Sequence, residues 1–177
     1  GLYFINADGA DKNKPTQIWT QGETEGSSCW FPTIDAPNQK TTQEIYITVP
    51  NKYKTLSNGE LISQTKEKEN RTDYWKMDQK HAPYLVFLGV GAFEVIKDSY
   101  KDIAVDYYVE KEYAKYAKGI FGNTPEMMEF FSNKLGIEFP WNKYSQIVVR
   151  DYVSGAMENT TAVVHGEQAY QTDGQLI

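Results

Sequence analysis

The sequence predicts a mostly antiparallel β chain that ends in an α+β segment. Short segments in which apolar and polar residues alternate, as in half-buried strands, follow one another up to residue 109. Near residue 110 the apolar spacing becomes helical. With 177 residues, 40% hydrophobic and 14% aromatic, the chain can form a sizeable core in one domain or in parts of two. We therefore expect a domain boundary between residues 1–109 and 110–177.

The first strands are expected to form a hairpin. A short strand from Leu2, a loop rich in Gly, Asp, Asn and Pro, and a second strand at Thr16–Thr20 fit this arrangement. Gln21 and Glu23 follow the second strand, and in an extended segment their side chains would point to the same face. The next stretch, Trp30–Pro37, carries two prolines and three large apolar residues, so we expect an irregular, buried connection.

Three strands are predicted between residues 44 and 64, two of them on either side of an Asn-Gly pair. The first, Glu44–Val49, alternates in the manner of a half-buried strand. Tyr53–Leu56 and Glu60–Gln64 flank Asn58 and Gly59, and an Asn-Gly pair suits the positive φ angles of a type I′ turn. These two segments are therefore expected to form a hairpin.

The remaining β segments lie between residues 66 and 109. The charged run Lys66–Arg71 is expected to be a solvated loop, followed by a strand at Thr72–Met77. Tyr84–Ile96 is the most apolar stretch and contains two glycines, which favours a bent or bulged strand buried on both faces. Ile103–Val109 is predicted as one more strand.

Two helices are expected next. Lys111–Ile120 has helical spacing, and a second helix is expected to begin with Thr124 as N-cap and Pro125 at the first helical position. Gly136 is expected to end it. Its apolar stripe, which we expect to be core, consists of Met127, Met128, Phe130, Phe131 and Leu135. Strands at Ser145–Arg150 and Ala162–His165 follow.

The segment Gly155–Asn159 has the makings of a peptide-binding edge. Gly155 and Ala156 are small and leave their main-chain groups open to an extended peptide, which could add to the edge as a strand. Glu158 could accept a charge-assisted hydrogen bond from the terminal ammonium of that peptide. A solvated turn at the end of a strand is the alternative that these residues alone leave open.

This segment, Gly-Ala-Met-Glu-Asn, resembles the exopeptidase signature of the aminopeptidase N family of gluzincin zinc metallopeptidases, which includes leukotriene hydrolase. Other segments resemble the family in the same order and at comparable separations: Thr20–Glu23, Trp30–Pro37 with Lys40, Leu56–Gly59, Tyr84–Phe87 and Phe139–Tyr144. The resemblance extends from about residue 16 to about residue 165. At Thr160 and Thr161 the sequence departs from many relatives, which have an aromatic residue or Pro followed by Gly.

The resemblance implies a fold and a set of substrate-binding residues. Residues 1–109 would be the later part of a saddle-shaped antiparallel N-terminal domain, and residues 110–177 the beginning of a thermolysin-like catalytic domain. Gln21 and Glu23 would help to bind the free amine of a peptide substrate, opposite Glu158. The main chain of Gly155 and Ala156 would hold the peptide, and Met157 and Asn159 complete the substrate-binding segment.

The zinc site of this family is not found in the sequence. The family binds zinc through His-Glu-x-x-His on a helix, with a later Glu. The chain has two histidines, His81 and His165, and neither has a second histidine four residues away. We therefore expect no metal ligand and no catalytic residue in this chain. It is expected to be an inactive fragment, ending before the zinc motif, of a zinc aminopeptidase.

Composition limits the expected partners. The net charge is −6 and no basic stripe is present, so we expect no nucleic-acid partner. No apolar run approaches the ~20 residues of a membrane span. A peptide with a free N-terminus is the expected substrate of the intact protein.

Two other functions remain as alternatives. One is a catalytically inactive relative that serves as a scaffold. The other is a β-sandwich module that binds carbohydrate through tryptophans and the many tyrosines. It would require a coplanar, exposed row of rings on one sheet, and the four tryptophans are Trp19, Trp30, Trp75 and Trp141.

Overall fold

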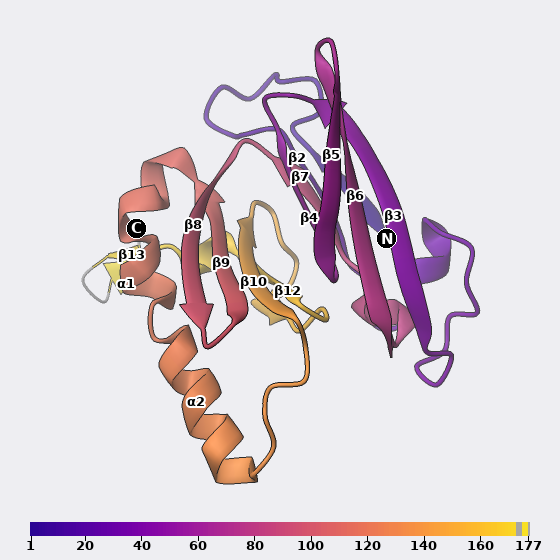
Figure 1. Cartoon of the computed structure of the whole chain (residues 1–177). Coiled ribbons are helices and arrows are strands. Elements are labelled where there is room, and N and C mark those ends of the chain that lie inside the picture. Colours follow the sequence, from indigo (N-terminus) through magenta and orange to yellow (C-terminus); the bar gives the residue numbers. More distant parts are fainter. Residues whose placement is uncertain (173–174, 177) are drawn as a thin grey trace. The chain divides into compact units, whose positions relative to one another are not determined.

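The chain divides into two compact units, each of which is described separately (Figure 1). The computed structural model describes residues 1–172, 175 and 176. Unit 1 consists of Gly1–Ala92 together with Glu158–Ala162, and unit 2 consists of Phe93–Met157 together with Val163–Ile177. The chain therefore returns to unit 1 for a short segment that includes Glu158.

A four-stranded sheet forms one part of unit 1. It contains β1 (Leu2–Ile5), β2 (Gln17–Thr20), β4 (Lys54–Ser57) and β7 (Leu88–Gly91) in the order β1-β2-β7-β4. Each neighbouring pair is antiparallel, and the predicted hairpin of the first two strands is confirmed. Trp19 on β2 is fully buried and stacks on Tyr3 of β1.

A three-stranded antiparallel sheet forms the other part of unit 1. It contains β3 (Thr41–Pro50), β5 (Glu60–Glu67) and β6 (Asn70–His81), with β6 in the centre. Alternation along the strands buries one face and exposes the other. Ile47, Val49, Trp75 and Met77 are buried, whereas the Tyr46 and Tyr74 rings stack on the opposite face. Two short 3₁₀ helices, η1 (Ser27–Cys29) and η2 (Pro83–Leu85), complete the unit.

The hairpin predicted around Asn58 and Gly59 is wrong. The strand before this pair, β4, bonds to β7, and the strand after it, β5, bonds to β6 in the other sheet. Gly59 does have a positive φ of 73°, as an Asn-Gly turn suggests. A side chain at this position would be excluded as well, because a Cβ would lie 1.9 Å from the Lys76 main-chain oxygen. Asn58 and Gly59 thus form a corner between two sheets.

Two loop predictions in unit 1 also need correction. Trp30–Pro37 is irregular, as expected, but none of its residues is buried, and Ile34 is largely exposed. Lys66–Arg71 is not one solvated loop, because β5 extends to Glu67 and β6 begins at Asn70. Arg71 is buried and donates hydrogen bonds to Asp73. This pairing explains why a charged residue is stable there.

The stretch Tyr84–Ile96 is two strands instead of one. It passes through η2 and β7, breaks at Ala92, and resumes as β8 (Phe93–Tyr100) in a different sheet. The break coincides with the boundary between unit 1 and unit 2.

Unit 2 is built on a five-stranded mixed sheet. Its order is β11 (Ala156–Met157), β12 (Ala162–Gly166), β10 (Lys143–Val149), β9 (Ile103–Glu110) and β8. Strands β8 and β9 form an antiparallel hairpin, whereas β9 and β10 are parallel. A short 3₁₀ helix, η4 (Glu167–Ala169), and a two-stranded sheet of β13 (Gln171–Thr172) and β14 (Gln175–Leu176) follow.

Helices connect the parallel strands of unit 2, because parallel neighbours require a long crossover. The connection contains η3 (Lys111–Tyr116), α1 (Ala117–Phe121) and α2 (Thr124–Leu135) (Figure 1). The first predicted helix is therefore mostly 3₁₀. Asn123, not Thr124, is the N-cap of α2, and Gly136 ends it with a φ of 67°, as predicted.

Most of the apolar stripe of α2 is not core, contrary to expectation. Met128 is buried, with 8% of its surface exposed, and it joins the cluster formed by Tyr107, Phe121 and Val148. The other members of the stripe are more than half exposed: Met127, Phe130, Phe131 and Leu135. Within unit 2, only one member of the stripe, Met128, is covered by the packing of the described residues. The predicted fold class itself is confirmed, with antiparallel strands followed by an α+β segment.

Candidate functional site

The segment Gly155–Met157 lies at the edge of the five-stranded sheet. Ala156 pairs with His165 and Met157 with Val164, so β12 occupies one side of β11. Among residues 1–172, 175 and 176, no strand occupies its other side. Met157 is buried, whereas Gly155 and Ala156 are exposed, and a Cβ on Gly155 would meet no atom within 4 Å.

The main chain of Ala156 points toward this open side. The Gly166 N–H donates a hydrogen bond of 3.0 Å to the Gly155 oxygen. Gly155 and Gly166 are therefore a hydrogen-bonded pair, and the next pair, Ala156 and His165, is non-hydrogen-bonded because the two kinds alternate along an antiparallel ladder. In such a pair the N–H and C=O groups face away from the partner strand. Ala156 thus presents one donor and one acceptor at an open edge.

Glu158 and Asn159 follow directly and belong to unit 1. The Glu158 side chain is exposed, and in the part of the chain that the structure describes it has no hydrogen-bond or ion-pair partner. Asn159 is 1% exposed, and neither polar atom of its side chain has a partner among the described residues. The Asn159 main-chain oxygen accepts a hydrogen bond from Ala162 N–H at 3.1 Å. A β-turn therefore follows the exposed carboxylate.

Gln21 and Glu23 do not lie on one extended segment. Strand β2 ends at Thr20, and Glu23 already belongs to a turn. Gln21 is buried, and its N–H donates to the Gly1 oxygen at 2.9 Å, whereas Glu23 is exposed. Gly22 between them packs closely, because a Cβ there would lie 2.4 Å from the Tyr84 oxygen. The rule that alternate residues share a face does not apply here, and the role of both side chains stays a prediction.

The residues that hold the turn after Glu158 were not identified from the sequence. Asn58 and Gly59 of the sheet corner bind the main chain of Thr160 and the side chain of Thr161. The departure at Thr160 and Thr161 from the pattern that the resemblance implies was an indication in the sequence. Thr161 has a φ of 63°, and a β-branched residue with a positive φ requires a local compensation.

The two histidines do not form a metal site. Burial lowers the pKa of His81 and that of His165 to about 4. The His165 Nε2 lies 3.0 Å from Gln146 Oε1, and the His81 ring nitrogens have no hydrogen-bond partner among the described residues. No group of three or more His, Cys, Asp or Glu side chains in the described ranges could hold a metal ion. The residues that the structure describes therefore do not fit a zinc site.

The tryptophans do not form an exposed row. Trp19 and Trp75 are buried, and the Trp75 indole N–H donates to Thr55 at 2.9 Å. Only Trp30 and Trp141 are partly exposed. A carbohydrate-binding face built from all four rings is therefore wrong. None of the helices in the described part of the chain has both the length and the apolar character that a membrane crossing requires.

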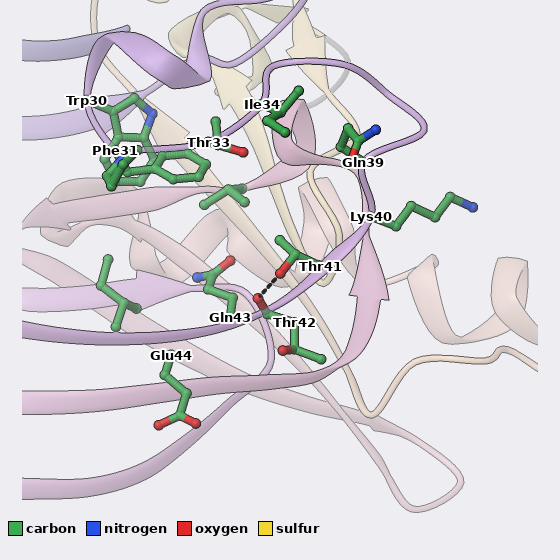
Figure 2. A pocket seen from close by; sticks show the side chains of 13 residues that line it. Trp30, Phe31, Thr33, Ile34, Gln39, Lys40, Thr41, Thr42, Gln43 and Glu44 are labelled. Atoms are coloured by element: carbon green, nitrogen blue, oxygen red, sulfur yellow. Dashed lines mark hydrogen bonds between the residues drawn. The ribbon is translucent and has the colours of Figure 1, made fainter.

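A cavity of about 490 Å³ lies in unit 1, beside the loop that begins at Trp30 and the start of β3 (Figure 2). Trp30, Phe31 and Ile34 contribute apolar surface to its wall. Figure 2 shows the Lys40 side chain extending away from the Trp30 and Phe31 rings. No predicted substrate-binding residue lines this cavity. The candidate site is therefore an edge and a turn, not a closed pocket.

Comparison with known proteins gives two family matches. The Peptidase M1 N-terminal domain matches residues 1–85, and the Peptidase family M1 domain matches residues 120–176. The predicted boundary at residues 109 and 110 lies between the matched ranges and stays a prediction.

Several curated proteins are similar to the chain over most of its length. The Tricorn protease-interacting factor F2 of Thermoplasma acidophilum is 30% identical over 170 residues, which are 96% of this chain and 21% of that protein. Glutamyl aminopeptidase of Bos taurus is 31% identical over 143 residues, or 77% of this chain and 14% of that protein. Aminopeptidase M1 of Arabidopsis thaliana is 27% identical over 163 residues, or 92% of this chain and 18% of that protein.

The chain spans about a fifth or less of the length of these relatives. Two separate parts of the chain nevertheless match the same family. The match to the N-terminal domain precedes the match to the peptidase domain, as the name of the N-terminal domain implies. The Gly-Ala-Met-Glu-Asn segment lies inside the second match. The chain belongs to peptidase family M1.

Proposed function

We propose that this chain is the amine-recognition part of a zinc-dependent aminopeptidase, which removes N-terminal residues from peptides. Membership of family M1 and relatives named as aminopeptidases support this proposal. The observation that carries it is the open edge of β11, followed at once along the chain by the unpartnered carboxylate of Glu158.

The substrate main chain is proposed to lie along β11 as an added strand. Ala156 offers the N–H and C=O groups that such a strand needs, since they face away from β12. The missing side chain of Gly155 and the small one of Ala156 allow close approach of another backbone.

The substrate ammonium is proposed to bind Glu158. A carboxylate without a partner is a strong acceptor for a cationic donor, and the resulting hydrogen bond is charge-assisted. Gln21 and Glu23 are proposed to contribute from the end of β2. Fixing the ammonium at one end of the edge strand restricts the enzyme to the first residue, and a peptide with an acylated N-terminus lacks the charge.

Zinc is proposed as the cofactor of the longer protein. Such a metal polarises the scissile carbonyl and activates water. Because the described residues contain no group of His, Cys, Asp or Glu side chains that could hold zinc, and the sequence lacks the His-Glu-x-x-His motif, we propose that ligands elsewhere in the longer protein hold the ion. The part described here contributes recognition and contains no catalytic residue.

The proposal is tested by Glu158→Gln in the full-length natural protein. Loss of one ammonium contact should cost about 2 to 4 kcal/mol, which lowers kcat/KM for free-amine peptides by roughly 30- to 1000-fold. Glu60→Gln, at an exposed position on β5, is the matched control and should leave the kinetics unchanged. Unchanged kinetics for Glu158→Gln would contradict the assigned role. A full-length protein that binds peptides but never turns them over would instead be the inactive scaffold.

A further inference from the structure

We infer that Asn58 and Thr161 are positioning residues that fix Glu158 for the substrate ammonium, an inference that rests on the proposed function. Glu158 has no partner of its own among the described residues. The position of its carboxylate therefore depends on the main chain that follows it. That main chain is held by bonds from the corner between the two sheets of unit 1.

The turn that follows Glu158 has an unusual backbone. It spans Asn159–Ala162 and is closed by the Ala162 N–H bond to the Asn159 oxygen. Thr161 is at its third position with a φ of 63°, which is the place of glycine in a type II turn. A β-branched residue is strained there, so the turn needs external support. The Asn159 side chain gives none, since its polar atoms make no bond to described residues.

Asn58 supplies the first support. Its Nδ2 donates hydrogen bonds to the main-chain oxygens of Thr160 and Leu85, and its Oδ1 accepts one from Phe87 N–H at 2.7 Å. The side chain is fully buried. It therefore ties the middle peptide of the turn to the backbone on both sides of Val86, which is part of the core of unit 1.

Gly59 and Thr161 supply the second support. The Gly59 N–H donates to Thr161 Oγ1 at 2.8 Å, and both residues are buried. The hydroxyl thus offsets part of the strain that the backbone of Thr161 carries. A glycine at this position would relieve the strain but would lack the bond, so the hydroxyl is what couples the turn to the corner.

The consequence for binding follows from the order of the chain. Glu158 directly precedes Asn159, which is buried, and both belong to unit 1. With the turn that follows it held to the corner of the same unit, the carboxylate samples fewer positions within unit 1 and loses less entropy when it binds an ammonium. Releasing the turn at Thr161 frees the main chain next to Glu158 and should weaken ammonium binding.

The test uses the full-length natural protein with Thr161→Val, Thr161→Gly and Thr161→Ser. Valine keeps the shape and removes the hydroxyl, glycine removes both hydroxyl and strain, and serine keeps the hydroxyl. We expect KM for a free-amine peptide to rise by about tenfold in the valine and glycine variants, with kcat changed by less than about twofold. Serine should restore KM to within about twofold of wild type. Thr48→Val, which loses a 2.8 Å hydroxyl contact with Thr72 on an exposed face, is the matched control and should leave KM unchanged.

A double-variant cycle separates positioning from general stability. If Thr161 acts through Glu158, Thr161→Gly should change KM by less than about twofold when Glu158 is already Gln. The same tenfold change in both backgrounds, or a normal KM in Thr161→Gly alone, would overturn the inference and leave the proposed function intact. Glu158→Gln without any effect would overturn both. Thr161→Gly keeps the test decisive even if the strained valine variant does not fold.

Discussion

The Asn58 side chain donates a hydrogen bond to the main-chain oxygen of Thr160, although 102 positions separate the two residues. The whole first segment of unit 2, Phe93–Met157, lies between them in the sequence. The family signature is consequently divided, with Gly155–Met157 in unit 2 and Glu158 and Asn159 in unit 1. The proposed main-chain recognition and the proposed charge recognition are therefore assigned to residues of different units.

The corner at Gly59 should be intolerant of any side chain. In Gly59→Ala, the alanine must adopt the left-handed conformation of Gly59, which lowers the free energy of unfolding by about 1 to 2 kcal/mol. Its Cβ also clashes with the Lys76 oxygen, which lowers it by roughly 1 to 3 kcal/mol more. Gly136→Ala is the matched control, because φ is positive there too but a Cβ would meet no atom within 4 Å. Urea unfolding of both variants should show the larger loss for Gly59→Ala. Equal losses would mean that the clash relaxes freely.

The two adjacent methionines of α2 should differ in their contribution to stability. Met128→Ala removes a side chain that is 8% exposed and should lower the free energy of unfolding by about 2 to 3 kcal/mol. Met127→Ala, at 54% exposed, should change it by less than about 0.5 kcal/mol. Chemical denaturation of the chain measures both. A large effect at Met127 would show that the outer face of the helix is covered in solution.

Stability should fall as the pH is lowered from about 6.5 to 4.5. Burial lowers the pKa of His81 and His165 to about 4, whereas the same two histidines have a pKa of about 6.5 in the unfolded chain. The unfolded state thus binds more protons in this window and is favoured as the pH falls, by on the order of 1 to 3 kcal/mol for each histidine. His81→Phe should remove about half of the dependence. A free energy of unfolding that is flat across this window would contradict the prediction.

Acid below pH 4 should act through a different group. Burial alone would raise the pKa of Asp73, but hydrogen bonds from Arg71, Thr55 and Gln64 lower it. This lowered pKa gives stability that is present above the unfolded pKa of about 4 and is lost as the pH falls further. Asp73→Asn should weaken the acid transition below pH 4, measured by circular dichroism, and leave the window of the histidines unchanged.

The chain should bind no zinc stoichiometrically and should cleave no aminoacyl substrate. Its two histidines lack the spacing of the zinc motif, and the described residues contain no group of ligands that could hold an ion. Equilibrium dialysis against zinc, followed by metal analysis, should give less than one ion per chain. One tightly bound zinc per chain, or turnover that persists after contaminating peptidases are removed, would contradict this.

The sequence predicted local elements well where a residue's own neighbours decide them. Alternation identified β3 and β6, β9 was predicted as one more strand, and the turn residues identified the β1–β2 hairpin. Gly136 marked the end of α2 because a left-handed C-cap is a local property. The segment Gly155–Asn159 was singled out because its residue types occur in a recognisable order, and its binding role stays a prediction.

The failures concern partners that are distant in the sequence. The Asn58-Gly59 pair correctly predicted a positive φ for Gly59 but wrongly predicted that the two flanking strands pair with each other. Strands β4 and β5 belong to two different sheets, and their partners are distant in the sequence. The stripe on α2 has helical spacing whether or not a partner covers it. The bonds from Asn58 to Thr160 and from Gly59 to Thr161 had no local pattern at all.

The split composition of unit 1 has a consequence for its synthesis. Translation delivers Asn58 long before Thr160, and the ribosome releases most of the five-stranded sheet in the interval. A nascent unit 1 therefore carries an amide donor and the Gly59 N–H without their final acceptors. Water must fill those positions until the last five residues of the unit arrive and displace it, so the turn that presents Glu158 is the final piece of unit 1 to be assembled.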